Sequence, residues 1–204
     1  MKISGDKLVI NRLKGFDDKI NQAASNAVNR AATLARNEGI DLILERVTLS
    51  KAYVSGRVNI ASRSSPTTLR AVIQSTTRAT ILDRFDSTSV KGGVRVRVNR
   101  SGGYKTISGA FMVKNLKGSH SSGIALSNKA AARYYKEMSG KSSNPLINAK
   151  ASKLANKAKA NPGGIHVLHS RSINQLFESV REDIQPTINT FLQATFLREL
   201  HAKC

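Results

Sequence analysis

The sequence predicts an α+β fold: a small, largely antiparallel sheet packed by a long N-terminal helix and a C-terminal helix, with a long basic arm. Two stretches, from Phe16 and from Ser172, carry apolar residues at spacings of three and four, which is the period of an amphipathic helix. Short runs rich in β-branched residues lie between them, as is typical of strands. We expect a single domain over residues 1–204.

The first element is an amphipathic helix from Phe16 that ends by Arg46. Its apolar stripe is mostly alanine, which lets a neighbour pack close: Phe16, Ile20, Ala23, Ala24, Ala27, Ala31, Leu34 and Ala35. Gly39 costs about 1 kcal/mol inside a helix, so we expect a weak point there. We interpret the stripe as a core face, with an oligomer interface as the alternative.

Two segments with strand-forming residues follow. Residues 48–61 suit either a short helix with Ser50 as its N-cap or a strand from Tyr53 to Ile60. Residues 69–85 are rich in β-branched side chains and predict one long bent strand or two short ones.

The segment GGVRVRVNRSGG, residues 92–103, predicts a strand over 94–98 between two glycine turns. Side chains alternate between the faces of a strand, so valines take the core face and arginines the other: Val94, Val96 and Val98 against Arg95 and Arg97. A one-residue slip would bury the arginines, so the pattern specifies the register. Residues 105–115 are the expected hairpin partner, in which Gly109 indicates a bulge or a close backbone approach.

A basic insertion at about 119–162 is predicted to be a flexible arm, with at most one or two helical turns within 126–138. It is rich in lysine and turn-forming residues, and Glu137 is the one acidic residue between 118 and 164. Such a composition buries too little apolar surface to order a chain by itself.

A short strand at 166–170 and a helix from about Ser172 close the chain. Pro186 interrupts the apolar pattern of that helix. Because proline lacks a backbone N–H and disfavours helix at the preceding residue, we expect a break or a kink at Gln185.

The charge of the chain points to an anionic partner. There are 33 Lys and Arg residues against 13 Asp and Glu, a net charge of +20. Nucleic acid is the commonest polyanion, and an acidic protein surface is the alternative. No apolar run reaches the roughly 18 residues that span a bilayer, so we expect no membrane partner, and the N-terminal residues do not predict a signal peptide. The single cysteine, Cys204, leaves no internal disulfide, which is compatible with a reducing cytosol.

The sequence lacks the residue patterns of a catalytic or metal site. Neither common glycine-rich phosphate-binding loop occurs. His166 and His169 lie three apart on an expected strand, so they should point to opposite faces. His201 and Cys204 lack an orienting group. We expect no enzyme, no metal and no cofactor.

Basic residues are therefore the candidate site, for binding an anion or a partner. Tyr134 and Tyr135 are the only candidates for base stacking, so a contact with the nucleic-acid backbone that ignores sequence, or docking on an acidic protein ring, fits better. The candidates are Arg95, Arg97, Arg100, Lys105, Lys114, Lys117, Lys150, Lys153, Lys157 and Lys159.

The order of several motifs resembles the minor tail protein Z family of lambda-like phages and prophages, also called tail completion proteins. The alanine-rich helix ends near LILERVTLSKAYV, and RAVIQSTTRATILDRF follows it. ISGAFMVKNLKG at 107–118 is the most family-like string, followed by SSGIALSNKAAARYY and IHVLHSRSINQLFESVREDIQPTINTFLQATFLREL. The resemblance covers roughly residues 15–200, but 139–162 is longer than the family pattern, so no role for it follows.

The resemblance implies a structural virion protein, made and assembled in the host cytoplasm. Such proteins act at the head-proximal end of the tail or in the neck and help to join tail to head. It also implies a homo-oligomeric ring, often of six subunits, around the DNA channel. Neighbours would be tail terminator, tail tube or head–tail connector proteins, and phage DNA contacted without sequence specificity. The alternatives are a tail terminator that caps the tail tube, or a sequence-non-specific nucleic-acid-binding module.

Overall fold

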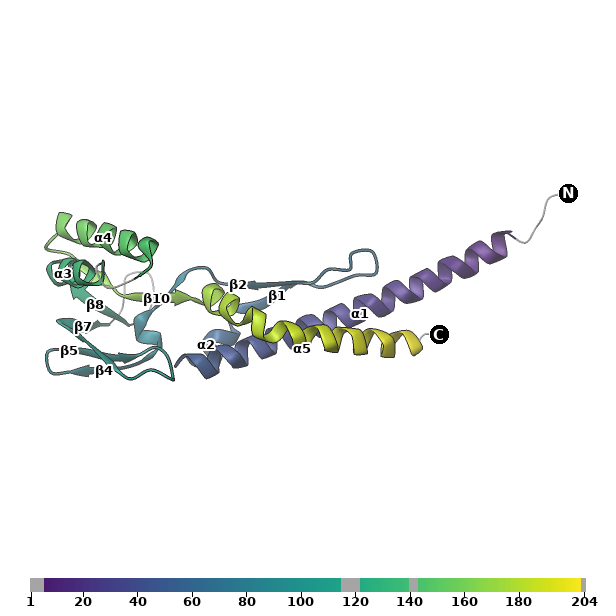
Figure 1. The fold of residues 1–204 in the computed structure, drawn as a ribbon, viewed down its shortest axis with the longest axis horizontal. Coiled ribbons are helices and arrows are strands. Elements are labelled where there is room, and N and C mark those ends of the chain that lie inside the picture. The colour runs from purple at the N-terminus through teal and green to yellow at the C-terminus, as the bar shows by residue number, and fades with distance from the viewer. Residues whose placement is uncertain (1–5, 115–121, 140–142, 203–204) are drawn as a thin grey trace. The chain divides into compact units, whose positions relative to one another are not determined.

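The structure is a computed structural model that describes residues 6–114, 122–139 and 143–202, with side chains from Asp17 onward (Figure 1). It confirms the α+β class, with 54% helix and 26% strand, small antiparallel sheets and long N- and C-terminal helices. In chain order the elements are α1 (Asp6–Arg46), α2 (Lys51–Ser55), β1 (Val58–Ser62), β2 (Val72–Ser75), β3 (Ala79–Ile81), the 3₁₀ turn η1 (Leu82–Arg84), β4 (Asp86–Val90), β5 (Gly93–Arg97), β6 (Lys105–Ser108), β7 (Ala110–Val113), β8 (Gly123–Ser127), α3 (Asn128–Ser139), α4 (Pro145–Ala160), β9 (Ile165–Val167), β10 (His169–Ser172) and α5 (Ile173–His201).

The residue contacts divide the chain into two compact units. The first unit comprises Met1–Leu44, Lys51–Arg78 and Ser172–Cys204, and the second unit comprises Glu45–Ser50 and Ala79–Arg171. The division by contacts does not test the expected single domain over 1–204, which stays a prediction.

The first unit is built on α1, which begins ten residues before the predicted start at Phe16. Its buried apolar side chains recur at helical spacing: Ala23, Ala27, Ala31, Ile40 and Ile43. The helix runs through Gly39 without a break and ends at Arg46, as predicted; the weak point at Gly39 stays a prediction. A β-carbon at Gly39 would lie 2.4 Å from a ring carbon of Phe177 in α5, so this glycine lets an aromatic ring pack against the helix backbone.

The hairpin of β1 and β2 completes the first unit. Its strands pair antiparallel, with Val58 opposite Ser75. The Arg36 guanidinium of α1 donates to the Val58 carbonyl at 2.7 Å, and the backbone N–H of Asn174 in α5 donates to the Thr76 carbonyl at 3.0 Å. Both alternatives for 48–61 were thus partly right, because a five-residue helix precedes the strand.

Helix α5 starts where the sequence indicated. The Ser172 hydroxyl accepts from the Gln175 backbone N–H, and the Gln175 side chain accepts from the Ser172 backbone N–H, a capping box that satisfies both donors. Of the two alternatives at Pro186 the break is wrong, since α5 is continuous to His201, and the kink stays a prediction. Pro186 is exposed, and so is Glu182, whose carbonyl loses its helical donor and can bond to water instead.

The second unit contains two three-stranded antiparallel sheets, in the orders β4–β5–β6 and β7–β8–β9, and a two-stranded pair of β3 and β10. The predicted alternation in β5 is confirmed for Val94 and Val96, which are 0% and 4% exposed, while Arg95 is exposed. Val98 follows the end of the strand and is only partly buried.

The segment 105–115, predicted to be one hairpin partner of β5, forms two strands, and only the first of them pairs with β5. β6 pairs with β5, whereas β7 pairs with β8 of the other sheet. Gly109, with a φ of 73°, lies between them. This left-handed conformation suits glycine, so the predicted bulge position is where the chain changes sheets.

The expected arm at 119–162 contains regular structure: strand β8 and two helices, α3 and α4, that pack on each other. Alanines form the buried positions of both helices: Ala131, Ala132, Ala151, Ala155 and Ala158. The prediction failed here because alanine and lysine are strong helix formers, and because Asn144 caps α4 with Pro145 as its first residue, which is a start signal. The flexibility of the insertion stays a prediction.

Candidate anion-binding surface

All ten predicted site residues belong to the segment Ala79–Arg171 of the second unit. The structure places four of them on or beside the sheet of β4, β5 and β6, and four on α4. Lys114 is exposed directly after β7, and Lys117 lies outside the described residues. The predicted set therefore forms two groups rather than one face.

The arginines of β5 contact other side chains of the same sheet. The Arg97 guanidinium pairs with the Asp86 carboxylate at 2.9 Å, and these residues lie directly opposite each other on β5 and β4. The Tyr104 ring lies under both arginines, with its centroid 4.2 Å from Cζ of Arg95 and 4.9 Å from Cζ of Arg97. We call these four residues the tyrosine–arginine cluster.

A lowered pKa keeps the Asp86 carboxylate of this cluster charged. The Tyr104 hydroxyl donates a hydrogen bond to Asp86, and this bond, followed by the effects of Arg97, lowers the pKa of Asp86. The same hydrogen bond raises the pKa of Tyr104. Asp86 therefore neutralises one arginine, and the cluster offers an anion one net positive charge.

Arg100 and Lys105 lie near the cluster in the sequence and differ in their contacts. The Arg100 Nε donates to the Val47 carbonyl at 3.2 Å, and its backbone N–H donates to the Arg46 carbonyl at 2.9 Å. Arg100 thus fixes the segment Glu45–Ser50 of the second unit. Lys105 is exposed on β6, opposite Val96.

The four predicted lysines of α4 are all exposed and form a larger basic surface. Lys150, Lys153 and Lys157 are spaced three and four residues apart, so they lie on one side of the helix, away from its buried alanines. We call these three residues the lysine stripe. Lys159 lies on another side. Within the described part of the chain, none of the four forms an ion pair with a carboxylate.

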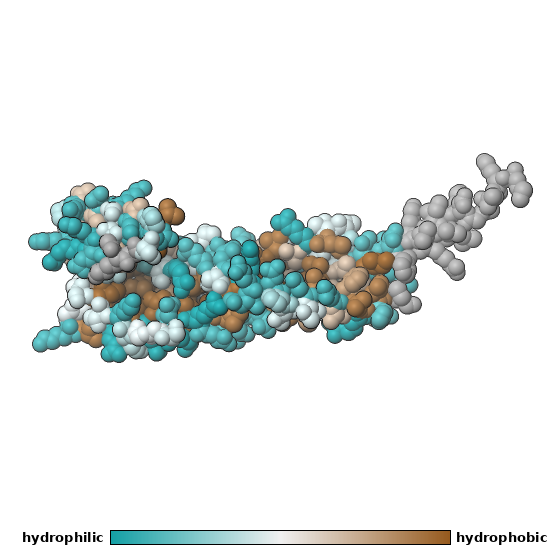
Figure 2. Space-filling model, in the orientation of Figure 1, coloured by the Kyte–Doolittle hydropathy of each residue, from teal (hydrophilic) through white to brown (hydrophobic). Residues whose placement is uncertain are grey.

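Helix α3 repeats the pattern. Lys129, Arg133 and Lys136 are exposed at spacings of four and three residues, so they too share one side of their helix. Figure 2 shows mostly hydrophilic residues over the surface of this helix pair.

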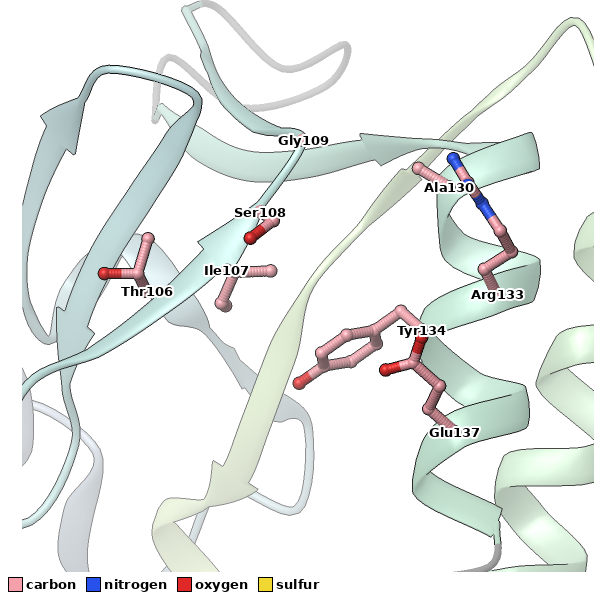
Figure 3. Close-up of a pocket in the computed structure, with 8 residues that line it drawn as sticks. All are labelled: Thr106, Ile107, Ser108, Gly109, Ala130, Arg133, Tyr134 and Glu137. Carbon is pink, nitrogen blue, oxygen red and sulfur yellow. The ribbon is translucent and has the colours of Figure 1, made fainter.

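A pocket of about 420 Å³ lies between β6 and α3. Tyr134 reaches from α3 toward β6 in this pocket (Figure 3), and burial raises the pKa of its hydroxyl. The lining residues are Thr106, Ile107, Ser108, Gly109, Ala130, Arg133, Tyr134 and Glu137. They provide polar contacts but no nucleophile paired with a base.

A second pocket, of about 400 Å³, brings His166 and His169 together beside Lys157. The expectation that the two histidines face apart is wrong, because the chain leaves β9 at Leu168 and the alternation of one strand does not continue to His169 on β10. The His166 Nε2 lies 2.9 Å from the Tyr135 hydroxyl. Burial, followed by the nearby His169 and Lys157, lowers the pKa of His166.

Sequence reasoning missed Tyr104, Asp86 and the shared histidine pocket. Only the pairing of β4 with β5 brings Asp86 to Arg97, and no spacing in the sequence reports that register. The described residues contain no cluster of His, Cys, Asp and Glu that could hold a metal ion.

The fold and this surface define a basic α+β protein whose exposed cations are candidates for anion binding. Comparison of the chain with protein-family models, curated proteins and solved structures finds no match. None of the helices, as far as the structure describes them, is long and apolar enough to cross a membrane.

Proposed function

We propose that this protein is a structural, non-catalytic virion component: a tail completion or neck protein at the head-proximal end of a phage tail. The observation that carries the proposal is the ordered set of motifs over roughly residues 15–200 that resembles the minor tail protein Z family. The net charge of +20 supports it, since such a charge suits a protein close to packaged DNA or to an acidic neighbour.

In this proposal the protein forms a ring of six subunits around the DNA channel, and contacts tail terminator, tail tube or head–tail connector proteins. The lysine stripe and the tyrosine–arginine cluster are the candidate contact surfaces. The cluster suits a positioning contact, since its single net charge is held in place by Tyr104 and Asp86. The stripe suits a contact governed by charge, since its lysines are exposed.

Mass spectrometry of purified particles from the phage or induced prophage that encodes the chain tests the proposal. We expect its peptides in intact virions at a few copies per particle, and gold-labelled antibody at the junction of head and tail. Absence from infectious particles would overturn the proposal. Label at the end of the tail tube in particles that lack heads, with none at complete junctions, would favour the tail terminator instead.

A sequence-non-specific nucleic-acid-binding module is the second candidate, and the exposed lysines of α4 favour it. The two candidates differ in size and in partner. Light scattering of the purified full chain, with and without duplex DNA, separates them: a monomer or dimer that DNA saturates supports the module, and a ring supports the tail protein.

A further inference from the structure

The lysine stripe of α4 is long and regular enough to follow a charged backbone. Its ends, Lys150 and Lys157, are seven residues apart, which is about 10 Å along a helix that rises about 1.5 Å per residue. A nucleic-acid duplex carries about one charge per 1.7 Å of its axis. The stripe therefore matches a length of duplex that carries roughly six phosphates.

The charge around the stripe is almost entirely of one sign. Residues 122–139 and 143–160 contain seven basic residues and one acidic residue, Glu137. A second row of exposed cations lies on α3, which packs against α4. Because nearby carboxylates do not neutralise these cations, an anion that approaches the helix pair is attracted at long range.

The side chains on and beside the stripe suit a nucleic-acid backbone better than an acidic protein. Protein interfaces are depleted of lysine and rely on aromatic, arginine and methionine anchors. On the exposed side of α4 the lysines are interspersed with Ser152 and Asn156, which are small and let a phosphate chain come close. Lysine is a point charge without the planar fork that reads a base edge, so the contact would not depend on sequence.

The first turn of α4 has a feature that suits a protein partner. Leu146 is 80% exposed and Ile147 is 49% exposed. An apolar pair at the edge of a basic helix can serve as an anchor in a protein interface. A substitution at Leu146 therefore distinguishes the two kinds of partner.

We propose that the lysine stripe binds the phosphate backbone of double-stranded DNA without sequence preference. The proposal rests on the proposed function for its setting, a DNA channel in a virion, and it names DNA as the partner of this surface. Lys150, Lys153 and Lys157 each contact a phosphate and displace its condensed counterions, so that binding weakens steeply as salt rises.

Fluorescence anisotropy with the full chain and two unrelated 25-base-pair duplexes tests this over a range of salt concentrations. The variant carries Lys150→Gln, Lys153→Gln and Lys157→Gln. A matched control, Lys19→Gln with Arg63→Gln and Lys91→Gln, removes the same charge from exposed positions elsewhere. Circular dichroism establishes that both variants keep the helix content of the parent.

We expect the slope of log K against log salt to fall by about 2.7 in the stripe variant, from about 0.9 for each lost phosphate contact. The control should change the slope by less than about one, and both duplexes should behave alike. Equal slopes for the two variants, or a strong preference for one duplex, would overturn the proposal. A protein partner would be indicated by a different result: the chain binds polyglutamate tightly, Leu146→Ala abolishes that binding, and the stripe variant binds DNA as the parent does. That result would also overturn the proposal.

This test and the virion test fail independently. If the stripe variant and the control variant have the same salt slope, the DNA contact is refuted even if the protein is found in particles. An intact slope difference with no protein in particles refutes the tail assignment and leaves the DNA contact standing.

Discussion

Gly39 and Phe177 give the sharpest test of packing in the first unit. In a helix interior, replacing glycine by alanine normally stabilises by about 1 kcal/mol. In this chain the new β-carbon would lie 2.4 Å from a ring carbon of Phe177, where ordinary contacts begin at 3.4 Å. The ring or the helix must therefore move by roughly 1 Å, and overpacking of this kind costs about 1–3 kcal/mol.

We therefore expect Gly39→Ala to lower the free energy of unfolding by up to about 2 kcal/mol, which is the overpacking cost less the gain in helix propensity. In a Phe177→Ala background the obstacle is gone, so the same change should stabilise by about 1 kcal/mol. The coupling energy between the two sites is then about 1–3 kcal/mol, within the range for residues in direct contact.

Urea denaturation followed by the helical circular-dichroism signal measures all four proteins of this double-mutant cycle. Because Phe177→Ala by itself leaves a cavity and lowers stability, the change on adding Gly39→Ala is the quantity to compare. If Gly39→Ala stabilises the parent as much as it stabilises the Phe177→Ala variant, then the ring does not pack on the helix and the reasoning is refuted.

Three further outcomes are expected in the second unit. Val96→Arg should destabilise by several kcal/mol, because it buries a charge in the core; a urea midpoint equal to that of the parent would contradict the predicted β5 faces. Gly109→Ala should cost about 1–2 kcal/mol, because φ is 73° there; no change in thermal midpoint would refute it. His166 has a lowered pKa when folded, so below pH 6.5 the unfolded chain takes up the proton first, and the free energy of unfolding should fall as pH drops from 7 to 5.5. His166→Gln should flatten that fall, and identical pH profiles from urea titrations would contradict it.

The elements that the sequence predicted are those whose signal is local. The alternation in β5 and the start of a helix at about Ser172 depend on neighbours within a few positions, and both were predicted correctly. The break at Pro186 was wrongly expected because the effect of a proline depends on whether the carbonyl of Glu182 can reach water, and exposure is a property of the folded chain.

Helix α4 was missed for a different reason. Its lysines and asparagines were taken as the mark of an unpacked arm, although its alanines recur at the spacing that buries them against α3. The tyrosine–arginine cluster depends on strand pairing across 11 residues between Asp86 and Arg97. The alternation in β5 excludes a shift of one residue, but a shift of two residues would keep the same faces and change the partner of Arg97. When strand pairing brings the residues of a site together from different segments, the periodicity of the sequence does not show which residues meet.

The discontinuity of the first unit sets an order in which the chain can fold during synthesis. The Asn26 amide donates to the Glu199 carboxylate at 3.0 Å, across 173 positions of the sequence, so α1 leaves the ribosome long before its partner exists. At about 5–20 residues per second, the alanine face of α1 waits roughly ten seconds or more for α5. Ala79–Arg171, by contrast, has emerged as one stretch by then. The nascent chain therefore completes its second unit first, and exposes α1 to chaperones or to copies of itself in the meantime.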